Sequence, residues 1–360
     1  MVLEYDTVLL IICSDRPEYL RRSLSKVMEY HPRRNYPIFI SEDGFRSSVR
    51  RVIEEAQGRW NVTAPSIPFL HVHHKNYNLP AENGYFKLAR HFKFALDALF
   101  YEHGSYGLTE PVQRVLILEE DLEIAVDFFQ YFSAVAPLLD SDESLLCASA
   151  WNDNSLRGKV RDEQQLMRSV DRRIIYSVVN NHVYQDFFPG LGWMLTRELW
   201  EELSPKWPSA YWDDWLREPA QRRGRHTIRP EISRTLHFGY HGVSNAQFNE
   251  FLSNVQLNTA SVPFAQVDLS YLSREKWDDY YLSTVRSSKR VTPQTFHQEM
   301  RQGVKEMSVA YRNNDHYVQI AEWAGVMGDI KAGVPRGAYR GIVTTYLQGV
   351  KLHLVPIDFQ

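Results

Sequence analysis

Apolar residues in the first half of the chain form short, nearly continuous runs that alternate with longer amphipathic segments. The short runs predict buried strands at residues 8–13, 36–43, 68–74, 114–121 and 145–153. The longer segments carry apolar residues at helical spacing and predict helices at residues 16–31, 47–59, 84–100 and 126–139. Buried strands separated by helices are typical of a mainly parallel sheet that is covered on both faces. We therefore expect an α/β fold.

Acidic residues follow three of the predicted strands. Asp15 follows the first strand, Asp43 ends the second, and the triplet Glu119, Glu120 and Asp121 ends the fourth. In sheets of this kind ligands bind beyond the carboxyl ends of the strands, which meet at one edge. The pattern therefore predicts a binding site at this edge.

The acidic triplet Glu119–Glu120–Asp121 is unusual because adjacent carboxylates repel one another and are costly to desolvate without a positive charge nearby. If the strand continues, alternation places Glu119 and Asp121 on one side and Glu120 on the other. Carboxylate oxygens are ligands for Mg²⁺ or Mn²⁺. The alternative is a solvated acidic turn that caps the next helix. The position of the triplet directly after a buried strand favours the metal site over the solvated turn.

A second motif, "YWDDW", places Asp213 and Asp214 between Trp212 and Trp215. In a structural interpretation one aspartate caps the following helix and the tryptophans anchor the core. In a functional interpretation an aspartate beside an aromatic wall takes a proton from a hydroxyl group. The spacing by itself favours the structural interpretation.

Two glycine-bearing turns and a histidine run complete the candidate motifs. Residues 187–195 and 237–248 match neither a Walker loop nor a dinucleotide fingerprint. The second turn is interpreted as a connector, with a lid that closes over a phosphate as the alternative. The run from His71 to His74 includes three histidines, but no cysteine or further histidine stands at zinc spacing, so we expect no zinc site there.

Composition narrows the class of protein. A chain of 360 residues with 44% hydrophobic and 24% charged residues is an ordinary globular protein of one or two domains. The net charge of -3 argues against nucleic acid or an anionic membrane as the main partner. No apolar run is long enough to span a bilayer, and no signal-peptide pattern is seen. Cys13 and Cys147 lie in apolar runs and are expected to be buried thiols without a disulfide framework.

Taken together and in order, several motifs resemble the N-acetylglucosaminyltransferase I family almost from end to end. The motifs are "LEEDLEIAVDFFQYF", "CASAWND", "FFPGLGWML", "PKWPSAYWDDWLREPAQRRGR", "RPEISRTLHFG", "VPFAQVDLSYL" and "GVPRGAYRGIVTTYLQGVKLHL". The resemblance implies a glycosyltransferase-A domain in residues 1–240, a donor-site loop and linker in residues 241–275, and a smaller C-terminal α/β domain in residues 276–360. It also implies an inverting, Mn²⁺-dependent transfer of N-acetylglucosamine from UDP-GlcNAc to mannose, in β1,2 linkage.

The resemblance assigns roles by motif. It implies that Asp121 binds Mn²⁺, Asp213 is the catalytic base, and the donor is held by Arg16, Asp43, His91, Glu119, Glu120, Leu191, Trp212 and Ser244. Within that set Arg16, Asp43 and His91 would form the uridine site, Glu119 would hold the sugar, Glu120 the ribose, and Trp212 would line the sugar. Leu191 and Ser244 would approach the donor, with residues 239–245 as the closing loop. The alternatives are a different acceptor such as O-linked mannose, a different donor sugar, or a sugar-binding relative without catalysis.

The chain departs from the family pattern at several points. Glu120 stands where the family usually has aspartate, which lengthens the reach of the proposed ribose contact. Gly44 and Thr227 stand where family members have cysteines, so those bridges are not expected. The family's membrane anchor and stem are not seen in this sequence. We expect either a trimmed catalytic region of a Golgi-type enzyme or a soluble relative from a reducing compartment, and the missing bridges favour the latter.

Overall fold

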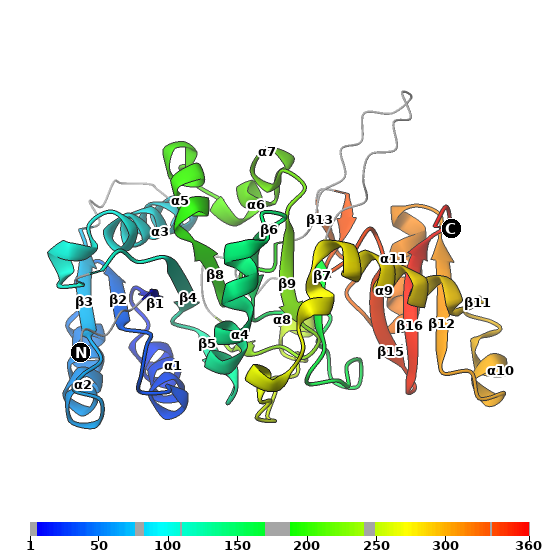
Figure 1. The fold of residues 1–360 in the computed structure, drawn as a ribbon, viewed down its shortest axis with the longest axis horizontal. Coiled ribbons are helices and arrows are strands. Elements are labelled where there is room, and N and C mark those ends of the chain that lie inside the picture. Colours follow the sequence, from blue (N-terminus) through cyan, green and yellow to red (C-terminus); the bar gives the residue numbers. More distant parts are fainter. Residues whose placement is uncertain are drawn as a thin grey trace.

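The computed structural model describes residues 6–75, 83–108, 110–169, 188–240, 249–331 and 333–359. Within these ranges an eight-stranded sheet occupies one side of the molecule and a four-stranded sheet occupies the other (Figure 1). Two short two-stranded sheets complete the described strands. The expected α/β class is confirmed.

The eight-stranded sheet is mainly parallel, as predicted. In spatial order its strands are β3 (Phe69–His74), β2 (Ile38–Asp43), β1 (Thr7–Cys13), β4 (Arg114–Glu119), β8 (Trp193–Thr196), β6 (Leu145–Ser149), β9 (His226–Pro230) and β7 (Leu166–Ser169). The pairs β3–β2, β2–β1, β1–β4 and β6–β9 are parallel, whereas β8 is antiparallel to both neighbours and β7 is antiparallel to β9. The carboxyl ends of β1, β2 and β4 therefore lie at one edge, as the sequence predicted.

Helices cover both faces of this sheet because their apolar stripes match its two buried faces. One core cluster joins alternate residues of β1, β2 and β4 to α1 (Pro17–Tyr30), α2 (Ser47–Thr63) and α4 (Phe128–Ser141). A second cluster joins the other residues of these strands to α3 (Gly84–Phe100), α5 (Arg197–Leu203) and α6 (Trp212–Arg217). The division gives the strand ends two distinct sides.

The smaller described elements connect these layers. They are η1 (His103–Tyr106), η2 (Ser204–Lys206), α7 (Pro219–Arg222), α8 (Asn249–Leu252), η3 (Phe264–Gln266), η4 (Ser270–Leu272), and the antiparallel pair β5 (Leu122–Ile124) and β10 (Thr235–His237). The pair β5–β10 follows the acidic triplet directly and is important for the site.

The C-terminal part has its own sheet and core. Its strands, in spatial order, are β11 (Lys289–Val291), β12 (Glu306–Tyr311), β16 (Val350–Pro356) and β15 (Val343–Leu347), with α9 (Arg274–Ser287), α10 (Phe296–Arg301), α11 (Asn314–Ala324) and the pair β13 (Ile330–Lys331) and β14 (Val334–Pro335) around them. A core cluster begins at Val291, whereas Trp277 and Tyr281 of α9 pack with the first cluster. The domain boundaries at residues 240 and 275 stay a prediction.

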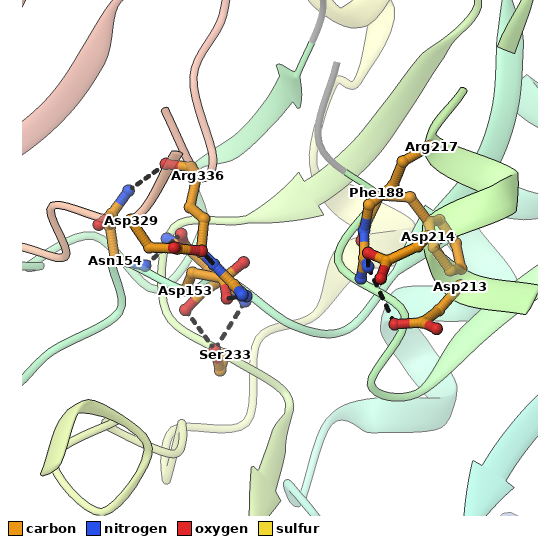
Figure 2. Close-up of polar contacts among 10 residues, drawn as sticks. Asp153, Asn154, Phe188, Asp213, Asp214, Arg217, Ser233, Asp329 and Arg336 are labelled. Atoms are coloured by element: carbon orange, nitrogen blue, oxygen red, sulfur yellow. Dashed lines mark hydrogen bonds and ion pairs between the residues drawn. The ribbon is translucent and has the colours of Figure 1, made fainter. Parts of the chain in front are cut away.

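A polar cluster ties the two parts together. Figure 2 shows Arg336 between Asp153, which follows β6, and Asp329. Arg336 Nη1 donates to Asp153 Oδ1 at 3.2 Å, and Asn154 Nδ2 donates to the Arg336 carbonyl at 2.9 Å. Among the described residues, no helix is both long and apolar enough to cross a membrane.

Candidate active site

The acidic triplet lies where β4 ends and the chain turns. β4 ends at Glu119, which is opposite Ile12 of β1, and the Glu120 backbone N–H donates to the Ile12 carbonyl at 3.0 Å. Glu120 and Asp121 then form a turn into β5. The predicted strand through residue 121 is therefore two residues too long, and strict alternation does not apply to the triplet.

Arg16 draws two of the three carboxylates to one side. Its Nε donates to Glu120 Oε1 at 2.7 Å, and its Nη1 donates to Asp121 Oδ2 at 2.9 Å. The Ser14 backbone N–H donates to Glu120 Oε2 at 3.2 Å. The expectation that Glu120 and Asp121 point in opposite directions is thus wrong, because the turn lets one guanidinium fork bind both.

The charges of this cluster shift the pKa values of its acids. Burial raises the pKa of Glu119 to about 8, and the charge of Asp121 adds to this increase while Arg16 opposes it. Burial also raises the pKa of Glu120 to about 7 against the charge and hydrogen bond of Arg16. One guanidinium therefore leaves the three acids with unbalanced negative charge.

Asp121, unlike Glu119 and Glu120, is held in its ionised form by contacts from the strand pair β5–β10. Burial opposes its ionised form, but His237, through a hydrogen bond and its charge, and Arg16 outweigh burial and lower the pKa of Asp121. His237 Nε2 lies 3.5 Å from Asp121 Oδ2, and the Phe238 backbone N–H donates to the Asp121 carbonyl at 3.0 Å. A Cβ on Gly239 would lie 2.6 Å from Asp121 Oδ2, so only glycine permits this close approach.

These residues fit a hard divalent cation. Asp121 supplies an ionised carboxylate, and among the described residues the Glu119 side chain has no hydrogen-bond or ion-pair partner. A cation at this place would offset the burial and the repulsion by Asp121 that together raise the pKa of Glu119. Carboxylate oxygens are the ligands that Mg²⁺ and Mn²⁺ prefer.

The "YWDDW" motif begins α6, and neither aspartate caps it. The N-cap residue is Tyr211, in a left-handed conformation at φ 51°, and it makes no side-chain cap bond. Arg217 Nη1 instead donates to Asp213 Oδ2 at 2.9 Å and to Asp214 Oδ1 at 2.7 Å (Figure 2). The expected helix cap is therefore wrong, and the two acids share one guanidinium at helical spacing.

Arg217 is fixed in turn by the backbone before β8. Its Nε and Nη2 both donate to the Phe188 carbonyl at 3.1 Å, and Phe188 is fully buried. The Asp213 side chain is 39% exposed, so it is held on one side and open on the other. This geometry suits a carboxylate that must meet a substrate.

Trp212 lies in a stack of aromatic rings. Its ring is 17° from parallel with both Trp193 and Trp207, each at a centroid distance of 5.8 Å, and it contacts Phe92 at 4.4 Å. Trp212 is 5% exposed. The structure thus gives it the anchoring position that spacing favoured, and its contact with a donor sugar stays a prediction.

Asp213 and the acidic triplet belong to one electrostatic site although they lie about ninety residues apart in the chain. The negative charge of Asp213 contributes to the raised pKa of Glu119. Two tyrosines border Asp213: Tyr85 stacks on Tyr211 at 4.4 Å, and burial and the charge of Asp213 raise the pKa of Tyr85. Tyr211 is 45% exposed. The tyrosine pair forms an open aromatic surface beside the proposed base.

Asp43 and His91 are brought together through His74, which was considered in the sequence only as part of a zinc motif. His74 Nδ1 lies 2.8 Å from Asp43 Oδ1, and the His74 ring stacks on His91 at 5.5 Å. His91 is 1% exposed and its Nε2 lies 2.8 Å from Ser41 Oγ. His91 therefore supports Asp43 from behind in this structure.

The chain before β8 places Leu191 against β10. The Leu191 carbonyl accepts a 2.7 Å hydrogen bond from Thr235 Oγ1, and a Cβ on Gly192 would lie 2.6 Å from the Thr235 side chain. Thr235 is two residues before His237 in β10, so Leu191 lies near the part of β10 that contacts Asp121. Ser244, the other residue expected near the donor, and residues 241–248 of the expected lid lie outside the described residues.

Two residues of the site, Arg217 and His237, were missed in the sequence, and His74 was considered only as a zinc ligand. Each of the three contacts an expected site residue, namely Asp213, Asp121 and Asp43 in that order. The signals were weak, because Arg217 is one of several arginines in its segment and His237 only opens a glycine-bearing turn.

The two cysteines are free and buried, as expected. Cys147 Sγ lies 3.5 Å from the hydroxyl of Thr227, its register partner between β6 and β9. A hydroxyl group thus stands beside this thiol where a second sulfur would be needed for a bridge.

A family model and a curated relative both relate this chain to the same family. The GNT-I family model matches residues 4–359. An alpha-1,3-mannosyl-glycoprotein 2-beta-N-acetylglucosaminyltransferase from Arabidopsis thaliana is 37% identical over 350 residues, which cover 95% of this chain and 71% of that protein.

Two solved structures show a distant similarity to this chain. A mannosyltransferase from Pyrobaculum calidifontis, in complex with GDP-Man and Mn²⁺, is 14% identical, covers 64% of this chain and 55% of its own, and has a TM-score of 0.38. TarS 1-349 from S. aureus is 11% identical, with 77% and 79% of the two chains covered and a TM-score of 0.39. Likenesses of this size carry no argument about this chain.

Proposed function

This chain belongs to the GNT-I family and is an N-acetylglucosaminyltransferase, and we propose that it transfers the sugar of UDP-GlcNAc to a mannose residue in β1,2 linkage, with inversion. The observation that carries the proposal is the convergence of Asp213 with the acidic end of β4. The charge of Asp213 helps to raise the pKa of Glu119, and Arg16 donates hydrogen bonds to both Glu120 and Asp121.

The donor would lie across the carboxyl edge of β1, β2 and β4. Asp43, which contacts His74 and through it His91, would meet the uridine, and Arg16 would join it from the acidic cluster. Glu120 accepts hydrogen bonds from the Ser14 backbone N–H and from Arg16. It would contact the ribose only if a ribose hydroxyl replaced one of these donors. Glu119, without a protein partner in the described ranges, is free to accept a hydroxyl of the donor sugar.

Mn²⁺, bound through Asp121, would neutralise the charge of the departing diphosphate. The protein's own contribution on this side is to keep Asp121 ionised. His237 and Arg16 do so against the cost of burial, and Gly239 allows the backbone to close over the carboxylate.

The transfer itself needs one base. A mannose hydroxyl oxygen attacks the anomeric carbon of the donor sugar, its proton moves to the Asp213 carboxylate, and the bond from that carbon to the diphosphate breaks. Arg217 holds Asp213 Oδ2, so the other oxygen is the one available for the proton. One displacement at one carbon inverts its configuration.

The same site is compatible with a second acceptor, an O-linked mannose, because none of the described contacts identifies the glycan beyond the sugar that reacts. The stacked pair of half-buried Tyr85 and exposed Tyr211 gives an aromatic surface beside Asp213 on which a pyranose face packs well. It does not distinguish one mannoside from another.

The function is tested by a transfer assay with a panel of UDP-sugars and mannosides, in Mn²⁺ and in chelator, with the product linkage determined by NMR. We expect turnover with UDP-GlcNAc and a terminal α-mannoside, a β1,2 product, and loss of turnover in chelator. Transfer from another UDP-sugar at a higher rate, or a product with retained configuration, would contradict the proposal.

A further inference from the structure

A second group of ligand-type side chains lies at the end of β2 and β3, away from the carboxylates of β4. Glu42 Oε2 lies 3.0 Å from His71 Nε2 and 3.0 Å from His73 Nδ1. These three atoms all lie within 4.8 Å of one another. The sequence did not predict a zinc site here, because the third ligand, Glu42, lies on a different strand about thirty residues earlier in the chain.

The strand pairing explains how the group forms. Glu42 is the register partner of His73 across the parallel pair β2–β3, and His71 lies two residues earlier on the same side of β3. Asp43 and His74 alternate to the opposite side, where α3 and His91 lie. The Glu42 group therefore lies on the opposite face of β2 and β3 from Asp43, His74 and His91.

We propose that Glu42, His71 and His73 form a second divalent-cation site, of which Zn²⁺ is the preferred ion. Two imidazoles and one carboxylate are a ligand set that suits zinc. Mn²⁺, the ion proposed for the acidic site, prefers oxygen ligands. This proposal is independent of the proposed transfer reaction.

The geometry is close to that of a three-ligand zinc site. Ligand atoms about 2.1 Å from a tetrahedral zinc ion lie roughly 3.4 Å from one another. The two separations from Glu42 Oε2, each 3.0 Å, need to open by only a few tenths of an ångström, and the two histidine nitrogens lie within 4.8 Å of each other. The fourth position is left for water or another ligand.

The group is also held in place by neighbours. The Arg46 backbone N–H donates to Glu42 Oε1 at 2.7 Å, which leaves Oε2 directed at the histidines. Glu42 is fully buried, and the exposed ring of Phe45 packs on His73 at a centroid distance of 4.9 Å. Contacts that orient a ligand and limit water at the site are typical of metal centres.

A simple ion pair explains only part of this arrangement. His71 has hydrogen-bond geometry with Glu42 Oε2, whereas His73 Nδ1 is buried and has no hydrogen-bond partner among the described residues. A proton between Glu42 and His71 leaves the His73 nitrogen unsatisfied, which is costly in a buried place. A cation satisfies all three atoms and cross-links the edge strand β3 to β2.

The test is zinc binding to tag-free protein, measured by calorimetry and by the visible spectrum of bound Co²⁺. The Asp121→Ala variant serves as the parent because it removes the proposed ligand of the acidic site. We expect one equivalent of tightly bound Zn²⁺ in this parent, with a rise in its unfolding temperature. Neither result depends on glycosyl transfer, so failure of the proposed function would leave the test valid.

His73→Ala in the parent should weaken zinc binding at least about 10–100-fold, since even the loss of a residue that supports a metal ligand has that effect. Its side chain is 30% exposed, so the variant should fold, which circular dichroism in chelator checks. Glu42→Gln, which keeps the shape, should also bind zinc more weakly. The matched control His297→Ala removes an exposed imidazole on α10 and should bind zinc as the parent does.

Two outcomes would overturn the proposal. One is a parent protein without a stoichiometric zinc site at micromolar concentrations. The other is zinc binding of equal strength in the parent and in both His73→Ala and Glu42→Gln. In either case the group is a hydrogen-bonded pair with an adjacent histidine.

Discussion

The ends of β4 and β2 carry buried carboxylates at the same edge of one sheet, but their partners differ. Glu120 and Asp121 share the guanidinium of Arg16, whereas Glu42 faces two imidazoles and a backbone N–H. The β4 cluster keeps an excess of negative charge and raised pKa values, and the pKa of Glu42 stays below its usual value. The partners of a buried acid therefore set its charge, and under the two proposals they also set which ion each strand end accepts.

The largest effect should follow the loss of the proposed metal ligand. Asp121→Ala should lower transfer about 10³-fold or more, because an ion that stabilises the leaving group contributes several kcal/mol. Donor binding, followed by calorimetry, should lose its dependence on Mn²⁺.

The matched control for that variant is Glu123→Gln, which removes the next carboxylate along the chain and only breaks an ion pair with Arg22. It should transfer normally. Donor binding of full strength by the wild-type chain in chelator would show that Asp121 does not act through a metal.

A second experiment separates chemistry from binding at α6. Asp213→Asn keeps the size of the side chain but removes the basic oxygen, so turnover should fall about 10²–10⁴-fold with donor affinity little changed. Steady-state kinetics and donor titration measure the two quantities. Asp214→Asn, which keeps its place beside Arg217, should retain most of the turnover. The reverse pattern would mean that the base is Asp214.

Removing the Arg16 guanidinium tests how much the charged partner of the β4 carboxylates contributes to the stability of the protein. Arg16→Gln leaves Glu120 and Asp121 buried without their charged partner, and the free energy of unfolding should fall by about 2–3 kcal/mol. Urea unfolding in chelator measures this loss. Mn²⁺ should restore part of it if a cation can replace the lost charge. No change in stability would show that the acids are protonated and need no partner.

The pH dependence of stability should differ between the two ends. Glu119 and Glu120 have folded pKa values of about 8 and 7, above the ordinary 4.5. Their contribution is therefore fully present below pH 4.5 and lost as the pH rises through about 7–8. In chelator, the free energy of unfolding should decrease by on the order of 5 kcal/mol between pH 5 and pH 8. Glu120→Gln should flatten this profile, and a wild-type profile in that variant would contradict the assignment.

The smallest effect is expected at Glu42, whose pKa is lowered. Burial opposes the ionised form, but hydrogen bonds from His71 and the Arg46 backbone outweigh it. The stability that this acid contributes is present above pH 4.5 and lost as the pH falls through the lowered value. Without metal, Glu42→Gln should cost about 1 kcal/mol at pH 7 and less at pH 3. Urea unfolding at both pH values checks this, and an equal loss at both would exclude a role for the charge.

The sequence by itself determined the strands and helices of the first half and the kind of enzyme. Helix 84–100 was predicted with its observed bounds, and the strands before Asp43 and Glu119 lie where apolar runs place them. Local patterns suffice there because burial on both faces requires continuous apolar strands. The motifs resembled the family to which the chain belongs, since a catalytic site keeps its residue types and their order.

Which side chains meet depends on how the strands and helices pack in three dimensions. The tertiary structure inserted β8 between β4 and β6, turned the chain after Glu119 so that one arginine binds two acids, and placed His237 on Asp121 from a strand far along the chain. It also brought Glu42 to His71 and His73 through the register of β2 and β3. Such contacts depend on strand order and register, which are set by the packing of the whole core and leave no local pattern in the sequence.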